Sequence, residues 1–430
     1  MDTMADSESS ARSKTADLVV EALDCLVHRY HFSLNQIFGE QLKTLTIDDM
    51  EKKAGLLEEL ESSLLPSMKD QITALLLSLD LRGWGKPPRP DLELALGIVS
   101  NLDQTLYETI ASIECISLES PLPAETHDHH LRSCKEFRCS RLLWRIKAVV
   151  EGHLCELFRN YIDFIRLWEL STSSSHPDSS EHHTKTSQKE AEILKITAHS
   201  GHLIDAIISL FRKSDLDFIQ EEWLAAADSL NGVLGFLIIL ANCPKEPNGI
   251  NAGRDDHRTN GNRAEIAEVA RLAIPLVKLT RAFLDKIGNK TTRKAAFTLD
   301  SELNSETLNQ LHQEPVSIAE RLDQFVRSLW MIHKRDEVII NKDRIRTSLS
   351  GISKTLESTL LVLAVYLVPL PHHENELPSP DPQFKTWLLT LKTLWYRAMD
   401  HFLDGLYCVG GGEYEQPLLQ DQPRRSWEAM

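Results

Sequence analysis

A short segment near residue 130 concentrates the side chains that most readily bind a metal ion. It holds three imidazoles and two thiols, at His127, His129, His130, Cys134 and Cys139. Neutral imidazole and thiolate groups bind zinc, but structural zinc sites hold their ligands in pairs at short, fixed separations. The five residues match no zinc finger or ribbon spacing. We therefore expect a solvated loop between two helices, with a metal site as the alternative.

Motifs for catalysis are missing from the sequence. A helical isoprenoid-type synthase needs Asp-Asp-x-x-Asp to hold magnesium, and neither Asp48-Asp49 nor Asp255-Asp256 completes that pattern. His127-Asp128 resembles the adjacent pair of metal-dependent phosphohydrolases, without the further ligands. The G-x-S-x-G, G-x-G-x-x-G and P-loop patterns do not occur. We expect no catalytic residue and no cofactor. A helical enzyme with a pocket between helices and no readable motif is the alternative.

The next candidate site is a stripe of basic residues at Arg132, Lys135, Arg138, Arg141 and Arg145. They recur every three or four residues, with Glu136 as the sole interspersed acid, which gathers positive charge on one side of a helix. The stripe either binds an acidic surface of a partner protein or pairs internally with acidic residues such as Glu58, Glu59 and Glu61. Nucleic acid is a weaker hypothesis, because no aromatic residues are interleaved.

The overall charge also argues against nucleic acid as a partner. The 430 residues include 47 Lys and Arg and 63 Asp and Glu, a net charge of −16 with neutral histidine. General phosphate binding needs a surplus of basic side chains. The seven cysteines are scattered and form no C-x-x-C motif, which favours reduced thiols in a cytoplasmic or nuclear protein.

We expect neither a secretory signal nor a membrane span. Residues 1–13 are polar and rich in serine, with no apolar core segment. The longest apolar runs, Val233–Ala241 and Leu360–Val368, are shorter than the roughly 20 residues of a membrane-spanning helix. We therefore expect both runs to be buried helix segments.

Helices must position these residues, because apolar side chains recur at helical spacing along most of the chain. The segments with this pattern are Leu92–Leu118, Cys134–Leu170, Ile193–Phe211, Phe218–Ala241, Ala264–Ile287, Ile318–Ile332, Val338–Val368 and Phe384–Tyr407. Asp91 and Ser214 are expected at helix starts, where a short acceptor satisfies free amides. No β-hairpin signal is present. The prediction is an all-α, multi-helix bundle of about nine to eleven helices, with a short coiled-coil-like seam in Ile318–Ile332.

Two polar segments suggest the domain organisation. Residues 171–188 are rich in Ser, Thr and His, and residues 242–263 in Asn, Gly and Pro, so we expect both to be flexible loops. We predict two helical bundles, either as separate domains or packed as one body. The predicted order is a disordered segment at 1–13, a bundle at 14–170, the loop at 171–188, a second bundle at 189–408 and a tail at 409–430.

The stretch from Glu268 to Ile287, EVARLAIPLVKLTRAFLDKI, resembles a group of uncharacterised fungal all-helical proteins. Their helix order is similar along most of the chain, and it is in turn similar to that of the cyclin-D-binding family of helical bundle proteins. The resemblance implies a non-enzymatic binding protein. We therefore hypothesise an intracellular helical protein that acts as an adaptor or regulator through contact with a protein partner. The sequence identifies neither that partner nor the oligomeric state.

Overall fold

The computed structural model describes residues 2–30, 46–81, 88–118, 124–173, 179–242, 254–288, 297–299, 303–335, 337–339, 341–369 and 382–408. These residues form an all-α, multi-helix protein, as predicted, with ten helices when segments joined through π-helical turns count as one. They also include two short antiparallel strands, β1 (Phe297–Leu299) and β2 (Leu367–Pro369), with Thr298 opposite Val368. The chain divides into two compact units.

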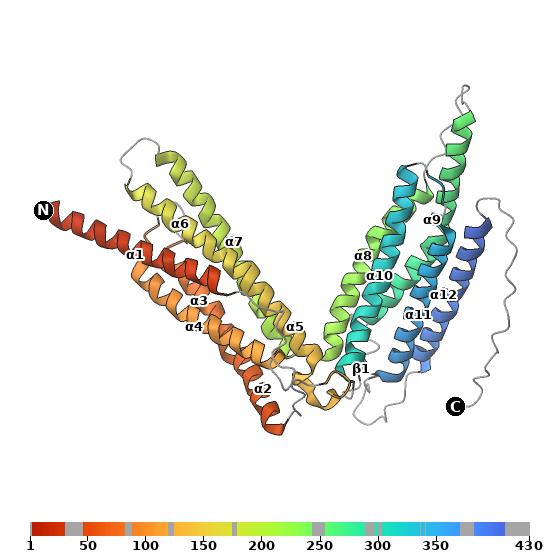
Figure 1. The fold of residues 1–430 in the computed structure, drawn as a ribbon, viewed down its shortest axis with the longest axis horizontal. Helices are drawn as coiled ribbons and strands as arrows, with labels where there is room; N and C mark the ends of the chain where they lie inside the picture. The colour runs from red at the N-terminus through yellow and green to blue at the C-terminus, as the bar shows by residue number, and fades with distance from the viewer. Residues whose placement is uncertain are drawn as a thin grey trace. The chain divides into compact units, whose positions relative to one another are not determined.

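Unit 1 comprises Met1–Asp217 together with Asp300–Asn309. Its long helices run alongside one another in Figure 1. Two of them, α2–α3 and α5–α6, continue through π-helical turns, in which the backbone hydrogen bonds span five residues instead of four. The elements are α1 (Asp2–Arg29), α2 (Ile47–Glu59), the π turn η1 (Leu60–Leu64), α3 (Leu65–Ser78), α4 (Leu92–Ser117), the 3-10 turn η2 (His129–Cys134), α5 (Glu136–Lys147), the π turn η3 (Ala148–Leu154), α6 (Cys155–Ser173) and α7 (Ser179–Phe211).

Unit 2 comprises Phe218–Leu299 and Gln310–Met430. Its elements are α8 (Asp215–Ala241), α9 (Arg254–Gly288), β1, α10 (Ser305–Lys334), α11 (Lys342–Tyr366), β2 and α12 (Pro382–Cys408). The first residues of α8 and α10 belong to unit 1. Within unit 2, α12 packs so closely on α9 that a Cβ atom at Gly405 would overlap the side chain of Leu272, which would have to shift to admit any other residue there.

Helix starts follow the expected local chemistry. Asp91 caps α4, because its Oδ1 accepts a hydrogen bond from Leu94 N at 3.0 Å. Ser214 and Asp217 form a reciprocal capping box at the start of α8: Asp217 N donates to Ser214 Oγ at 3.2 Å, and Ser214 N donates to Asp217 Oδ2 at 2.8 Å. Both expected caps are therefore confirmed.

The division of the chain differs from the predicted one. The expected boundary loop at 171–188 is largely helical, since α6 extends to Ser173 and α7 begins at Ser179. Both helices belong to unit 1, which ends only at Asp217 and includes a later segment of the chain. The prediction was wrong because a polar helix end carries no apolar periodicity. Helix packing on the rest of the unit, and not local composition, decides where such a helix ends.

Two further segments that were predicted to be disordered or flexible are partly or wholly helical. The N-terminal segment expected to be disordered lies in α1, which begins at Asp2, and α9 begins at Arg254, inside the loop expected at 242–263. Residues 243–253 and the tail predicted at 409–430 lie outside the described residues.

Candidate functional site

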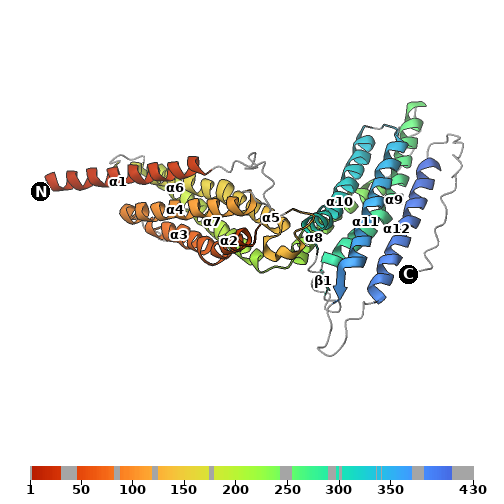
Figure 2. The ribbon, with the colours of Figure 1, turned by 60° about the horizontal axis from the view of Figure 1, so that its bottom comes forward.

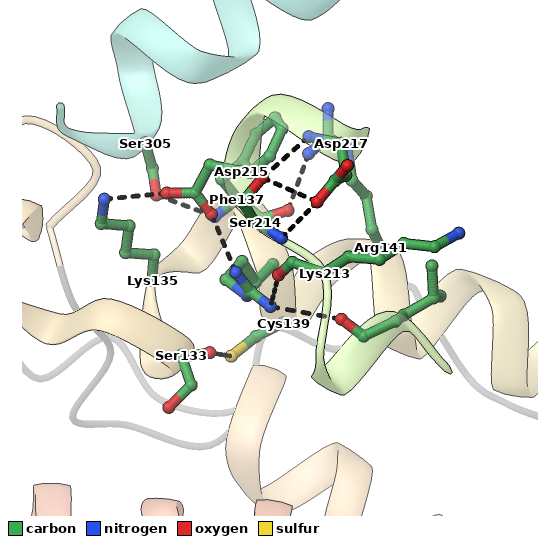
Figure 3. Close-up of polar contacts among 12 residues, drawn as sticks. Ser133, Lys135, Phe137, Cys139, Arg141, Lys213, Ser214, Asp215, Asp217 and Ser305 are labelled. Atoms are coloured by element: carbon green, nitrogen blue, oxygen red, sulfur yellow. Dashed lines mark hydrogen bonds and ion pairs between the residues drawn. The ribbon is translucent and has the colours of Figure 1, made fainter. Parts of the chain in front are cut away.

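A polar cluster at the start of α5 contains three of the five residues of the predicted basic stripe. Lys135, Arg138 and Arg141 come from the start of this helix. They meet residues 210–217, at the end of α7 and the start of α8, and residues 304–309, at the start of α10. All of these segments belong to unit 1. Figure 3 shows Lys135, Asp215 and Ser305 converging from three separate parts of the chain.

Asp128 caps two helices at once. Asp128 is only 1 % exposed. Asp128 Oδ2 accepts a hydrogen bond from Glu136 N at 2.9 Å, at the start of α5, and Oδ1 accepts one from Ser305 N at 2.8 Å, at the start of α10. Ser305 Oγ also donates to Asp128 Oδ2 and accepts from Phe137 N at 2.8 Å. A carboxylate is well suited to this position, because it satisfies free amides and opposes the positive end of each helix dipole.

Asp215 is the shared acceptor of two cations of the stripe. Lys135 Nζ lies 3.0 Å from Asp215 Oδ2, and Arg138 Nη1 lies 3.1 Å from Asp215 Oδ1. The side chains of Lys135, Arg138 and Asp215 are 2 %, 11 % and 17 % exposed. Charges buried to this extent are costly unless they are paired. Arg138 Nη2 also donates to the carbonyls of Lys213 at 2.7 Å and Leu210 at 3.2 Å, which holds the link between α7 and α8.

Arg141 is also used within unit 1. Its guanidinium carbon lies 3.6 Å from the centre of the Phe137 ring, and its Nη1 donates to Phe137 O at 2.8 Å and to Asn309 Oδ1 at 3.1 Å. Arg145 is half-buried, and Arg132 is exposed at a residue with φ of 47° in η2. The five residues therefore lie in different environments.

The side of α5 that carries Lys135, Arg138 and Arg141 packs against other segments of unit 1, so these three residues do not form an exposed partner-binding stripe. The alternative of internal pairing describes the observed kind of contact, but the acid is not Glu58, Glu59 or Glu61. The partner is Asp215, whereas Glu61 Oε1 accepts from Arg212 Nε at 3.0 Å. The capping motif at Ser214 was visible in the sequence. The pairing of Asp215 with residues about 80 positions earlier was not.

Glu136 experiences opposing influences in this cluster. Burial raises the pKa of its carboxyl above the usual value, and the neighbouring charge of Glu125 raises it further. The amide of Asn309 and the charge of Arg141 act in the opposite direction without reversing the shift. The net effect disfavours the charged form of Glu136 relative to the unfolded chain.

The residues considered for metal binding are dispersed. His127, His129 and His130 are exposed, whereas Cys134 and Cys139 are buried. Burial raises the pKa of both thiols, and Cys139 Sγ contacts Ser133 O at 3.8 Å (Figure 3). Among the described residues, no group of three or more His, Cys, Asp or Glu side chains is placed to hold a metal ion.

A second candidate site lies on the exposed side of α11 and α12 in unit 2. We define the α11–α12 face by Lys354, Glu357, Leu361 and Val365 of α11 and by Lys385, Leu389, Lys392 and Tyr396 of α12. Leu361, Val365 and Leu389 are 67 %, 62 % and 66 % exposed, which is unusually open for aliphatic side chains of this size. Figures 1 and 2 show the two helices side by side.

Contacts between the two helices establish the register of this face. Trp395 Nε1 donates to Ser353 Oγ at 2.9 Å, and Lys392 Nζ lies 2.8 Å from Glu357 Oε1. The helices are antiparallel, so one turn further along α11 and one turn back along α12 places Leu361 opposite Leu389. The three exposed aliphatic side chains therefore adjoin one another across the helix pair.

Glu357 is the acidic residue between the two helices of this face, and it forms an ion pair with Lys392. Partial burial by itself raises the pKa of its carboxyl, but hydrogen bonds with Lys392 and Tyr396 and the charge of Lys392 outweigh it, and the net effect is a lowered pKa. Burial, followed by the hydrogen bond with Glu357, raises the pKa of Tyr396 to about 12. Glu357 thus interacts with two residues of α12, Lys392 and Tyr396.

The exposure of Leu361 and Val365 contradicts the expectation that the whole run Leu360–Val368 is buried. The run is mostly helical, but a helix that packs on one side of a bundle exposes every third or fourth residue. The same holds for the run Val233–Ala241 at the end of α8, where Phe236, Ile238 and Ile239 are 41 %, 48 % and 52 % exposed.

Among the described residues, α8 is the one helix that is long and apolar enough to cross a membrane by length and composition. This is weak evidence, because core helices of water-exposed bundles meet the same criterion. Three of its large side chains, Trp223, Leu230 and Leu237, are fully buried in unit 2.

Comparison with known families divides the chain close to the boundary of the two units. Residues 53–212 match a family described as Domain of unknown function (DUF8723), and residues 214–404 match one described as Domain of unknown function (DUF8721). No curated protein and no solved structure matches the chain. Each family match covers less than half of the 430 residues. The chain is thus similar to one such domain in unit 1 and to a different one in a region that consists mainly of unit 2.

Proposed function

We propose that the chain is a non-enzymatic helical protein that acts by binding another protein through the α11–α12 face. The observation that carries this proposal is the exposure of Leu361, Val365 and Leu389, side by side on two helices. Burial of an aliphatic side chain of this size contributes about 1.5–3 kcal/mol. Contiguous apolar side chains left in water often mark an interaction site.

The polar cluster of unit 1 is a less suitable binding surface than the α11–α12 face. The polar cluster of unit 1 holds segments of that unit to one another, so its charges serve an internal purpose. The stretch from Glu268 to Ile287 resembles uncharacterised all-helical proteins whose helix order is similar to that of a binding family, and this resemblance supports a binding role.

The proposal is tested by affinity capture from native extract with the full chain and with a variant that carries Leu361→Ser and Leu389→Ser. The control carries Leu94→Ser, because Leu94 is also an exposed leucine, at 54 %, but lies on α4 of unit 1. We expect at least one protein to be captured by the wild type and the control and lost with the double variant. Identical captured sets for all three proteins would contradict the proposal.

A further inference from the structure

We infer that the partner of the α11–α12 face is an acidic amphipathic helix, an inference that rests on the proposed function. The first reason is charge. Between Gly351 and Tyr366 the charged residues of α11 are Lys354 and Glu357, and between Pro382 and Asp400 those of α12 are Lys385, Lys392, Arg397 and Asp400. Four cations thus stand against two anions, in a chain whose overall charge is −16.

The two anions do not cancel the cations toward a partner, because Glu357 is already paired and Asp400 lies one turn beyond Tyr396, at one end of the face. Glu357 is paired with Lys392 and hydrogen-bonded to Tyr396. Lys354 and Lys385 are exposed at opposite ends of the apolar centre. A partner that covers the leucines would therefore be best matched by acidic side chains on both flanks of its own apolar residues.

The second reason is shape. Leu361 and Val365 stand one turn apart on α11, about 6 Å along its axis, and Leu389 faces them from α12. Two antiparallel helices leave a shallow groove between them, into which the ridge of a third helix packs. Helical ligands use anchors one turn apart in such grooves. The three aliphatic side chains match one or two turns of an amphipathic helix.

The same charges disfavour a second copy of this chain as the occupant. In a symmetric dimer each copy presents the same face to the other, so the lysines of one α11–α12 face would oppose those of its twin. Like charges brought together in an interface weaken it.

The inference is tested by selection from a displayed library of short helical peptides with the full chain as bait. Each peptide has two leucines one turn apart, and its remaining exposed positions carry Glu, Lys or Ala at equal frequency. We expect the selected peptides to be enriched in Glu. Because the chain as a whole is strongly acidic, non-specific attraction would enrich Lys instead, so enrichment in Glu is a stringent result.

A selected acidic peptide is then titrated against purified variants by fluorescence anisotropy. The double change Lys354→Glu with Lys385→Glu should weaken binding about tenfold, and Leu361→Ser with Leu389→Ser should abolish it. Lys195→Glu, an exposed lysine of α7, is the matched control and should leave binding unchanged. Circular dichroism confirms that each variant remains helical. Added salt should weaken the wild-type interaction, because it screens exposed charges.

The outcomes separate this inference from the proposed function. Selection of neutral or basic peptides that still require Leu361 and Leu389 would overturn the acidic class and keep the face as a binding site. Failure to enrich any peptide, or enrichment that ignores the two leucines, would overturn both. Binding of the chain to anionic phospholipid vesicles through the same leucines, or self-association lost with them, would replace the peptide helix by a membrane surface or a second copy.

Discussion

Asp128 and Ser305 stand 177 residues apart in the chain and are joined side chain to backbone and side chain to side chain. The buried carboxylate of Asp128 therefore caps the N-termini of both α5 and α10. The pairing explains why Asp300–Asn309 belongs to unit 1, although it follows β1 of unit 2 in the sequence.

Replacement of Asp128 by Ala should lower the free energy of unfolding of unit 1 by about 2–4 kcal/mol, because it leaves the buried Ser305 N and the half-buried Glu136 N without their acceptor. Asp128→Asn should cost less, since its amide oxygen can still accept one of these bonds. Urea unfolding followed by circular dichroism measures both. Glu21→Ala, an exposed carboxylate of α1, is the control. An equal effect of Asp128→Ala and Glu21→Ala would show that the double cap contributes nothing.

Asp215→Asn should destabilise the protein more than Lys135→Met. The first change leaves two largely buried cations without their shared anion, and breaking a buried pair in this way costs about 3–5 kcal/mol. Lys135→Met removes one buried cation and leaves Asp215 paired with Arg138. Chemical denaturation of both variants checks the order. Lys69→Met, which removes an exposed ion pair with Asp205, should change stability by only about 0–1 kcal/mol. The reverse order of Asp215→Asn and Lys135→Met would refute the shared-acceptor geometry.

Glu136→Gln should stabilise unit 1 at neutral pH and not at acidic pH. Burial raises the pKa of Glu136 in the folded state above its value in the unfolded chain. As the pH rises, the Glu136 carboxyl therefore loses its proton in the unfolded state before it does so in the folded state. The resulting destabilisation is absent below the unfolded pKa and complete above the folded one. The variant should therefore gain a small amount of stability at pH 7 and none near pH 4. A gain of equal size at both pH values would assign the effect to packing.

Thiol labelling under native conditions at neutral pH should separate the cysteines by exposure. Cys25 and Cys408 are exposed and should react first with a maleimide. Cys134, Cys139 and Cys155 are buried, and burial raises the pKa of each thiol, so they should react only after unfolding. Peptide mapping by mass spectrometry reads out each site. Early labelling of Cys139 would show that the start of α5 opens readily.

Helical periodicity in the sequence was enough to predict the fold class and most helices. The predicted segment Leu92–Leu118 became α4 (Leu92–Ser117), and Phe384–Tyr407 became α12 (Pro382–Cys408). The polar ends of α1, α7 and α9 were missed, because their first turns contain few apolar residues to mark a buried side. Apolar periodicity detects the part of a helix that packs, and helices continue beyond it.

The sites were harder to predict than the helices. The spacing from Lys135 to Arg141 correctly implied one side of a helix. Whether that side faces water depends on Asp215 and Asn309, which reach it only through the tertiary fold. The exposure of Leu361 and Val365 was equally hidden, because an apolar run has the same composition whether a neighbour covers all of its sides or only some.

The return of Asp300–Asn309 to unit 1 has a consequence for the order of events on the ribosome. Asp128 and Phe137 emerge long before Ser305, and translation of the intervening residues after Asp217 takes roughly 5 to 20 seconds at typical rates. During that interval Asp128 and the start of α5 lack their hydrogen bonds with Ser305, while the residues of α8 and α9 are already being made. The nascent chain thus passes through a stage at which the first unit awaits its last segment, and a chaperone that recognises this incomplete surface would act there.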